Sequence, residues 1–157
     1  MLAKKLCPGE AVAKSKFGVV TDDELLARVV VSPRHFQKDG TIKPGVLPLS
    51  HIAQGGLSLM RTDHMDAAEL AVQAQRIAGA ETAAGVLLTK TRPIREITDD
   101  NGNRSLCVID DPEPLNEAHA AAVQSGALGA DDPEIKRIRG VLMDLFGGLV
   151  PLTQAKA

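Results

Sequence analysis

The sequence predicts an α+β domain in which three helices pack against a small, mostly antiparallel sheet with a central hairpin at about residues 94–110. Three observations lead to this prediction. A hairpin signal lies in the middle of the chain, an amphipathic helix with both caps lies near its end, and strands and helices are mixed, with the helices gathered late. We expect a loosely ordered arm over residues 1–20, one domain over residues 21–150 and a disordered tail over residues 151–157.

The hairpin is the most clearly marked element. An Asn-Gly dipeptide at Asn101 and Gly102 stands between two arms, Ile94–Thr98 and Ser105–Asp110. Such dipeptides favour the tight turns that join antiparallel strands. The acidic stretch at residues 110–114 contains two prolines, which cannot donate to a strand ladder, so the second arm ends there.

The first half of the chain predicts short elements separated by turns. Thr21–Glu24 has the capping-box pattern and predicts a helical turn, and the β-branched run that follows Arg28 predicts a strand ended by Ser32 and Pro33. A turn is expected at Gln37–Gly40, with a positive φ at Gly40. Leu57–Met60 predicts a further short extended piece.

The predicted helices come later in the sequence. Thr62 and Asp63 are candidate N-caps for a helix that runs to about Ala78 and ends at Gly79, after which residues 85–89 predict a buried strand. The alanine-rich segment 116–124 predicts a short helix. The last helix has the clearest limits, with Asp132 as cap, Pro133 in the first turn and a Gly-Gly stop at residues 147–148. Its apolar residues recur at spacings of three and four: Ile135, Ile138, Val141, Leu142, Leu145 and Phe146.

Composition limits the classes of function. The chain has 157 residues, a formal net charge of −2, three phenylalanines and neither tryptophan nor tyrosine. An aliphatic core is therefore expected, and the aromatic platform that commonly holds single-stranded nucleic acid is missing. No apolar run approaches the roughly 20 residues that a membrane-spanning helix needs. We expect a cytoplasmic protein with no membrane association, and the composition disfavours a nucleic-acid partner.

Charge is unevenly distributed along the sequence. Residues 28–61 contain five basic residues and one acid, whereas residues 99–117 contain six acids and one arginine. The two segments could neutralise each other in the fold. Otherwise the basic segment faces an anionic ligand or an acidic partner.

Cys7 and Cys107 are the only two cysteines, so they form the one pair that the sequence allows. Neither belongs to a CxxC or Cys/His spacing, which argues against structural zinc. Cys107 lies in an apolar run and is predicted to be a small buried hydrophobic residue.

Several catalytic classes lack their motifs. The chain contains no GxxxxGK[ST] and no strand-borne GxGxxG, and the segment around Ser58 has only the first glycine of a serine-hydrolase elbow. His51, Asp63 and His64 are the only reasonable set of metal ligands, and they lack the usual spacing. No metal and no cofactor are predicted.

The favoured functional hypothesis is a small non-enzymatic subunit or accessory protein of a bacterial-type multiprotein system. Segment 33–64 is basic and rich in glycine and proline, which suits recognition of a protein partner. The candidate binding residues in it are Arg34, His35, Lys38, Asp39, Lys43, His51 and Arg61.

An enzyme that processes NAD or another nucleotide is the alternative, through ADP-ribosyl transfer or NAD hydrolysis. Arg28 would hold a pyrophosphate, Ser58 would orient it, and an acid such as Glu96 or Glu113 would stabilise a ribosyl cation. This order loosely resembles the Arg, Ser, Glu order of ADP-ribosyltransferases, although the Ser-Thr-Ser and aromatic features of that family are missing. NAD is the cofactor expected under this alternative only.

Two further hypotheses stay open. His64 next to the start of the predicted helix could act as an acid or base beside Arg61. A nucleic-acid-binding accessory protein that uses the basic loop is a third functional class.

Overall fold

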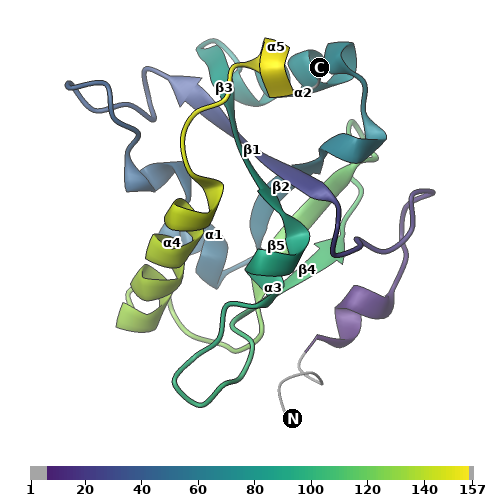
Figure 1. The fold of residues 1–157 in the computed structure, drawn as a ribbon, viewed down its shortest axis with the longest axis vertical. Helices are drawn as coiled ribbons and strands as arrows, with labels where there is room; N and C mark the ends of the chain where they lie inside the picture. Colours follow the sequence, from purple (N-terminus) through teal and green to yellow (C-terminus); the bar gives the residue numbers. More distant parts are fainter. Residues whose placement is uncertain (1–6, 156–157) are drawn as a thin grey trace.

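The computed structural model describes residues 7–155 and confirms the α+β class (Figure 1). Five strands form one antiparallel sheet in the order β3-β1-β2-β5-β4. The strands are β1 Leu25–Ser32, β2 Leu57–Arg61, β3 Thr82–Lys90, β4 Leu106–Asp110 and β5 His119–Gln124. The helices are α1 Leu49–Ala53, α2 Ala67–Ala78, α3 Thr91–Arg95, α4 Pro133–Phe146 and α5 Leu152–Ala155.

Alternating residues of the strands build a hydrophobic core on each face of the sheet. Leu26 and Val30 of β1 belong to the core that α4 covers, whereas Ala27 and Val29 belong to the core that α2 covers. In Figure 1, α4 and α1 lie together at the lower left, and α2 and α5 lie together at the top. Because strand side chains point alternately to opposite faces, one apolar run serves both cores.

Strands β1 and β2 are paired over a short distance only. Eight residues of β1 pair with β3, but the described register between β1 and β2 consists of Leu26 with Arg61 and Ala27 with Met60. Beyond Ala27 the two strands are no longer paired, and the polar residues Arg28 and Ser58 stand on them at this point. The sheet is therefore open in its middle, and the opening positions the candidate site.

The last helix forms as the sequence predicts. Asp132 accepts a hydrogen bond from the amide of Glu134 at 2.8 Å, Pro133 is the first helical residue, and Gly147 ends the helix with φ at +67°. The predicted turn around Gly40 is also confirmed, with φ at +89°. These signals are local in sequence, so tertiary contacts do not compete with them.

The first arm of the predicted hairpin is wrong. The turn itself is present, since Thr98 and Arg104 form an antiparallel bridge around Gly102, and the second arm is β4. Of the predicted arm Ile94–Thr98, however, Ile94 and Arg95 belong to helix α3, and Thr98 alone forms a bridge. Pro93 lies within the first turn of this helix, where the missing amide hydrogen costs no intrahelical bond.

The predicted helix over residues 116–124 is also wrong, because most of this segment is strand β5. It lies between β2 and β4 and pairs with both. Ala120, Ala121 and Ala122 are all buried, one after another, as expected for a central strand with both faces covered. Helix propensity of alanine is a weak preference, and pairing with two neighbours outweighs it here.

Helix α2 begins later than predicted. Its N-cap is Asp66, which accepts a hydrogen bond from the Glu69 amide at 2.8 Å, whereas Thr62 and Asp63 lie in a 3-10 turn. The capping-box pattern at Thr21–Glu24 does form a turn, with the Thr21 amide donating to the Glu24 carboxylate at 2.9 Å. The chain then enters β1, which contains the predicted strand.

The predicted arm and tail lie partly outside the described residues. Within residues 7–20, Cys7 forms a disulfide with Cys107, so Cys107 is a buried half-cystine and not a free hydrophobic thiol. Glu10 of this arm forms ion pairs with Arg95 and Arg104 at 2.9 and 2.6 Å. In the predicted tail, α5 covers residues 152–155. How the chain divides into domains stays a prediction.

None of the helices in the described part of the chain combines the length and apolar character that crossing a membrane requires.

Candidate functional site

The opening between β1 and β2 leads into a cavity of about 560 Å³. Its walls come from β1 and β2, from the irregular segment between β1 and α1, from α2 and from the loop before β5. A cavity of this size accommodates a ligand of the size of a nucleotide or cofactor. Seven of the residues that the sequence suggested for a site line it: Arg28, Arg34, His35, Lys43, His51, Ser58 and Glu113.

Positive charge dominates the lining. The cavity receives four permanently basic residues, Arg28, Arg34, Lys43 and Arg76, and one carboxylate, Glu113. Arg34 pairs with Glu81 at 2.9 Å and Arg76 lies 4.0 Å from Glu113, both as partly exposed contacts that leave the cations accessible to solvent. Arg28 and Lys43 form no ion pair with any residue that the structure describes. The cavity therefore attracts an anion.

Arg28 is the central cation of the cavity. Its Nε donates to the carbonyl of Val46 at 2.9 Å and its Nη1 to the carbonyl of Ser58 at 3.1 Å, so two backbone oxygens fix the guanidinium across the opening. Burial, together with the charge of Arg34, lowers the pKa of Arg28 to about 10. A phosphate or carboxylate of a ligand would stabilise the charge of an arginine held this way, because the described part of the protein supplies no counter-charge.

His35 lies beside this cation and is buried. Its Nδ1 accepts a hydrogen bond from the amide of Val31 at 2.9 Å, so the proton of the neutral ring is on Nε2. Burial lowers the pKa of His35 below its ordinary value, and the charges of Arg34 and Arg28 lower it further. At neutral pH the ring is thus a neutral donor in a positive environment.

Ser58 and His51 complete the predicted part of the lining. Both are exposed, Ser58 on β2 and His51 on α1. No hydrogen bond within the described residues involves the Ser58 hydroxyl, which is therefore available to a ligand.

The loop before β5 and the first residue of β5 contribute Asn116 and His119, which sequence reasoning did not select for the site. Asn116 and His119 are buried and line the cavity, and Glu113 adds its only carboxylate. The incorrect helix over residues 116–124 is the reason that Asn116 and His119 were not linked to the site. Had the segment been recognised as a strand, His119 would stand at its first residue, directly opposite Met60 on β2.

The other predicted residues lie away from the cavity. Lys38 and Asp39 are at the exposed tip of the loop, where Asp39 accepts hydrogen bonds from the amide and hydroxyl of Thr41. Glu96 is exposed at the end of α3, so Glu113 is the only one of the two proposed acids that the structure brings to Arg28 and Ser58.

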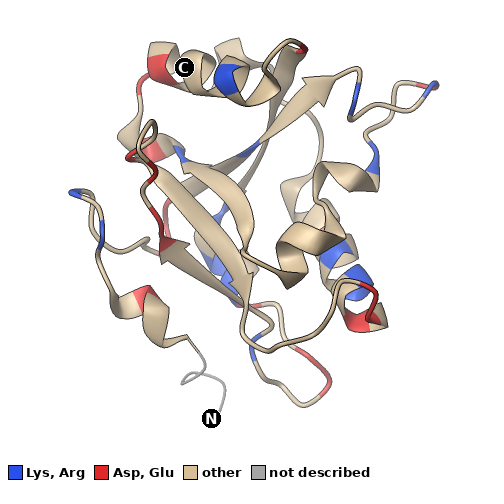
Figure 2. Cartoon of the chain, turned by 180° about the vertical axis from the view of Figure 1, so that it is seen from behind, with Lys and Arg blue, Asp and Glu red and all other residues tan. Residues whose placement is uncertain are grey.

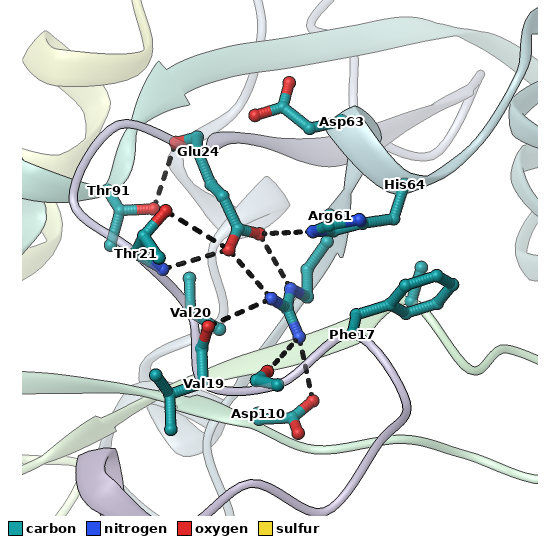
Figure 3. A network of polar contacts seen from close by, with 12 residues as sticks. Phe17, Val19, Val20, Thr21, Glu24, Arg61, Asp63, His64, Thr91 and Asp110 are labelled. Atoms are coloured by element: carbon teal, nitrogen blue, oxygen red, sulfur yellow. Dashed lines mark hydrogen bonds and ion pairs between the residues drawn. The ribbon is translucent and has the colours of Figure 1, made fainter.

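Arg61 and His64 belong to a separate buried network (Figure 3). Arg61 is fully buried and donates to Glu24 at two positions, both at 2.7 Å, and to Asp110 at 2.9 Å. Its remaining donor capacity goes to the carbonyls of Gly18 and Val19. His64 stacks on Phe17, with ring centroids 4.5 Å apart, and its Nε2 lies 3.5 Å from Glu24. Every donor of Arg61 is used within the protein.

The network keeps its carboxylates ionised. Burial by itself raises the pKa of Glu24, but hydrogen bonds from Arg61 and from the Thr21 amide outweigh it, so the pKa lies below its ordinary value. The same balance lowers the pKa of Asp110, where burial is outweighed by hydrogen bonds from Ser15 and the Lys14 amide and by the charge of Arg61. Both partners of Arg61 therefore stay charged at neutral pH.

Neutralisation between the basic and acidic segments is only partial. Among the described residues, Arg61 with Asp110 is the one ion pair between residues 28–61 and residues 99–117. Figure 2 shows basic and acidic residues distributed over many elements of the fold. The charges of Arg28 and Lys43, which form no ion pair with a described residue, are therefore not neutralised by the acidic segment.

Comparisons of the chain with protein-family models, with curated proteins and with solved structures found no match.

Proposed function

We propose that the protein is an enzyme that processes NAD or a related nucleotide in the cavity between β1 and β2. The observation that carries this proposal is that Arg28, Ser58 and Glu113 line one cavity although they are far apart in sequence. Arg28 lacks a carboxylate partner among the described residues, and the other charged residues of the lining are three basic residues and one carboxylate. These features support binding of a ligand with two phosphates.

Each residue has a role in this proposal. Arg28 holds the pyrophosphate, and the free hydroxyl of Ser58 orients the ligand. The bond between the ribosyl carbon and nicotinamide breaks, and nicotinamide leaves as a neutral molecule with the bonding electron pair. Glu113 stabilises the positive charge that develops on the ribosyl group. In hydrolysis, water adds its hydroxyl to that carbon and its proton passes to Glu113 and then to solvent.

Incubation with NAD and chromatography of the products tests the proposal. We expect release of nicotinamide together with ADP-ribose, abolished in Glu113→Gln and retained in Lys136→Ala, which changes an exposed residue of α4. Unchanged NAD after prolonged incubation at high protein concentration would contradict the proposal. A transferase with a missing acceptor is distinguished by including small alcohols and amines as acceptors.

A protein-binding role for segment 33–64 is the second candidate. Lys38 and Asp39 at the exposed loop tip, outside the cavity, favour it, because they remain accessible when the cavity is filled. A stoichiometric complex that co-purifies from the native host and survives Arg28→Ala would support this role. Loss of the complex in Lys38→Ala would place the contact at the tip.

A cytoplasmic location stays a prediction, and the disulfide between Cys7 and Cys107 bears on it. Disulfides persist mainly in oxidising compartments. Alkylation of free thiols at the moment of host-cell lysis tests this point. Full labelling of both cysteines agrees with the cytoplasm, whereas complete protection argues against it.

A further inference from the structure

Two basic residues of the cavity, Lys43 and Arg34, have no role in the proposed reaction. Both line the cavity and both are exposed, whereas Arg28 is partly buried and is fixed across the opening between β1 and β2. In the proposed function the pyrophosphate of the ligand is held at Arg28. The lining therefore offers positive charge beyond that which the pyrophosphate uses.

A short hairpin brings these two residues together. Phe36 and Ile42 form an antiparallel bridge, and the Lys43 amide donates to the His35 carbonyl at 2.8 Å. Arg34 directly precedes His35 in the sequence, so Arg34 and Lys43 lie close together at the base of the hairpin. Two cations that are separated in sequence thus meet at the exposed end of the cavity.

The charges of Lys43 and Arg34 are accessible to a ligand. Nζ of Lys43 has neither an ion pair nor a hydrogen bond with a described residue. Arg34 donates through Nε to Glu81 at 2.9 Å in a partly exposed contact, and within the described chain its Nη groups form no hydrogen bond. Burial lowers the pKa of His35, and the charges of Arg34 and Arg28 lower it further. Lys43 acts in the same direction and Glu81 in the opposite one, so all three cations act on one residue of the cavity wall.

The backbone also connects the base of the hairpin with Arg28. The carbonyl of Val46 accepts from Nε of Arg28 at 2.9 Å, and the amide of Val46 donates to the Lys43 carbonyl at 3.0 Å. Lys43 therefore lies one 3-10 turn away from the place where Arg28 is fixed. A ligand of nucleotide size reaches both positions, with one anionic group at Arg28 and another at the exposed end of the cavity.

We propose that Lys43 and Arg34 bind a third phosphate, so that the ligand is NADP, whose adenosine ribose carries a 2′-phosphate that NAD lacks. This inference rests on the proposed function. A basic side chain that accommodates the 2′-phosphate is a known means by which dinucleotide sites accept NADP. Such a phosphate monoester carries a charge of about −1.5 to −2 at pH 7, which two neighbouring cations complement. The bond that breaks is unchanged, so the products are nicotinamide and 2′-phospho-ADP-ribose.

Isothermal titration calorimetry on the full chain at physiological ionic strength compares ADP-ribose with 2′-phospho-ADP-ribose. Neither ligand contains the bond that the proposed reaction breaks. We expect 2′-phospho-ADP-ribose to bind at least about 10-fold more tightly. In Lys43→Met, which keeps the aliphatic part of an exposed side chain, this ratio should fall at least about five-fold, while affinity for ADP-ribose changes less than about two-fold.

Lys38→Met is the matched control. It removes the same charge from the exposed tip of the same hairpin, outside the cavity, and should leave the ratio of the two affinities unchanged. If Lys38→Met lowers the ratio as much as Lys43→Met does, the preference comes from general attraction of charge and the assignment of a third phosphate site is wrong. Equal weakening of both ligands in Lys43→Met would also overturn it, because the cations would then hold one pyrophosphate together.

The ligand comparison separates this inference from the proposed function. Equal affinity for the two ligands, or tighter binding of ADP-ribose, would overturn recognition of a third phosphate while the proposed function stands. Absence of binding by both ligands would overturn the two together. Because this comparison is made on the unaltered protein, it does not depend on the folding of any variant.

Discussion

Arg28 and Arg61 lie on neighbouring strands of one sheet, but only the charge of Arg61 is paired with carboxylates among the described residues. Arg61 on β2 is fully buried and has two carboxylates, Glu24 and Asp110, within 2.9 Å. Arg28 on β1 is partly buried and has two backbone carbonyls but no carboxylate among the described residues. A buried charge with its counter-charges belongs to the fold, whereas a buried charge without them is available to a ligand.

The polar groups around the two arginines differ in the same way, because those near Arg61 have hydrogen-bond partners and several of those near Arg28 do not. Around Arg61 the hydrogen bonds are complete and involve the segment before β1, through Gly18 and Val19 (Figure 3). Around the cavity of Arg28, the Ser58 hydroxyl and buried atoms of Asn116 and His119 have no hydrogen-bond partner in the part of the chain that the structure describes. One half of the β1 and β2 pair is thus a structural ion network, and the other half has the features of a binding site.

Removal of Arg61 should have the largest effect on stability. Arg61→Ala leaves Glu24 and Asp110 buried without their cation, and breaking a buried ion pair on one side costs about 3–5 kcal/mol. Urea denaturation followed by circular dichroism measures the loss. A variant that also replaces both carboxylates by leucine should recover part of it. If Arg61→Ala lowers the free energy of unfolding by less than about 1 kcal/mol, Arg61 is not a structural residue in the sense proposed.

The disulfide should have the next largest effect. Cys7 and Cys107 are 100 residues apart and fasten the segment that supplies Gly18 and Val19 to Arg61. Replacing both cysteines by alanine should lower the free energy of unfolding by about 2–4 kcal/mol. The reduced natural chain should show a similar loss in urea. If neither change lowers the midpoint, the arm does not contribute to the network.

Acid should weaken the Arg61 region selectively. The pKa values of Glu24 and Asp110 are lower in the folded protein than the ordinary values of 4.5 and 3.8. Their stabilisation is therefore complete above the ordinary values and is lost as the pH falls through the lower values of the folded state. Urea midpoints from pH 7 to pH 3 should fall steeply in the natural chain and less steeply in Arg61→Ala. Parallel curves would contradict this assignment.

Prediction from sequence succeeded where the signal was local. Asp132, Pro133 and Gly147 limit α4 through contacts within a few residues, and these formed as expected. The partners of Arg61 lie 37 and 49 residues away, so its sequence neighbourhood gave no indication that it is fully paired. For Arg28, Ser58 and Glu113, residue chemistry suggested a common site, and only the pairing of strands brings them to one cavity.

Strand β5 shows why the rest of the site could not be predicted. Alanine favours helices in isolation, but its small side chain also suits a strand buried on both faces. The choice between the two depends on neighbours that are distant in sequence. With β5 taken as a helix, His119 and Asn116 had no relation to Arg28.

Removal of Arg28 should change binding more than stability. Arg28→Met keeps the aliphatic stem and removes a charge that burial disfavours, so the free energy of unfolding should change by less than about 1 kcal/mol. Affinity for ADP-ribose should fall at least about 10-fold, because the phosphate contact proposed for Arg28 is lost. Calorimetry and urea denaturation on one preparation measure both. A large loss of stability with unchanged affinity would reverse the roles assigned to the two arginines.

The smallest effect concerns His35, which reports the field around Arg28. Burial lowers the pKa of His35, and the charges of Arg34 and Arg28 lower it further. Arg28→Met removes one of these charges, so the pKa of His35 should rise, as followed by NMR of the imidazole protons. Because the folded pKa is lower than the unfolded one, His35 favours unfolding as the pH falls below about 6.5, the ordinary value for histidine. The same variant should reduce that loss of stability. Lys136→Ala should leave the titration unchanged. An unchanged pKa of His35 in Arg28→Met would show that the charge of Arg28 does not act on His35.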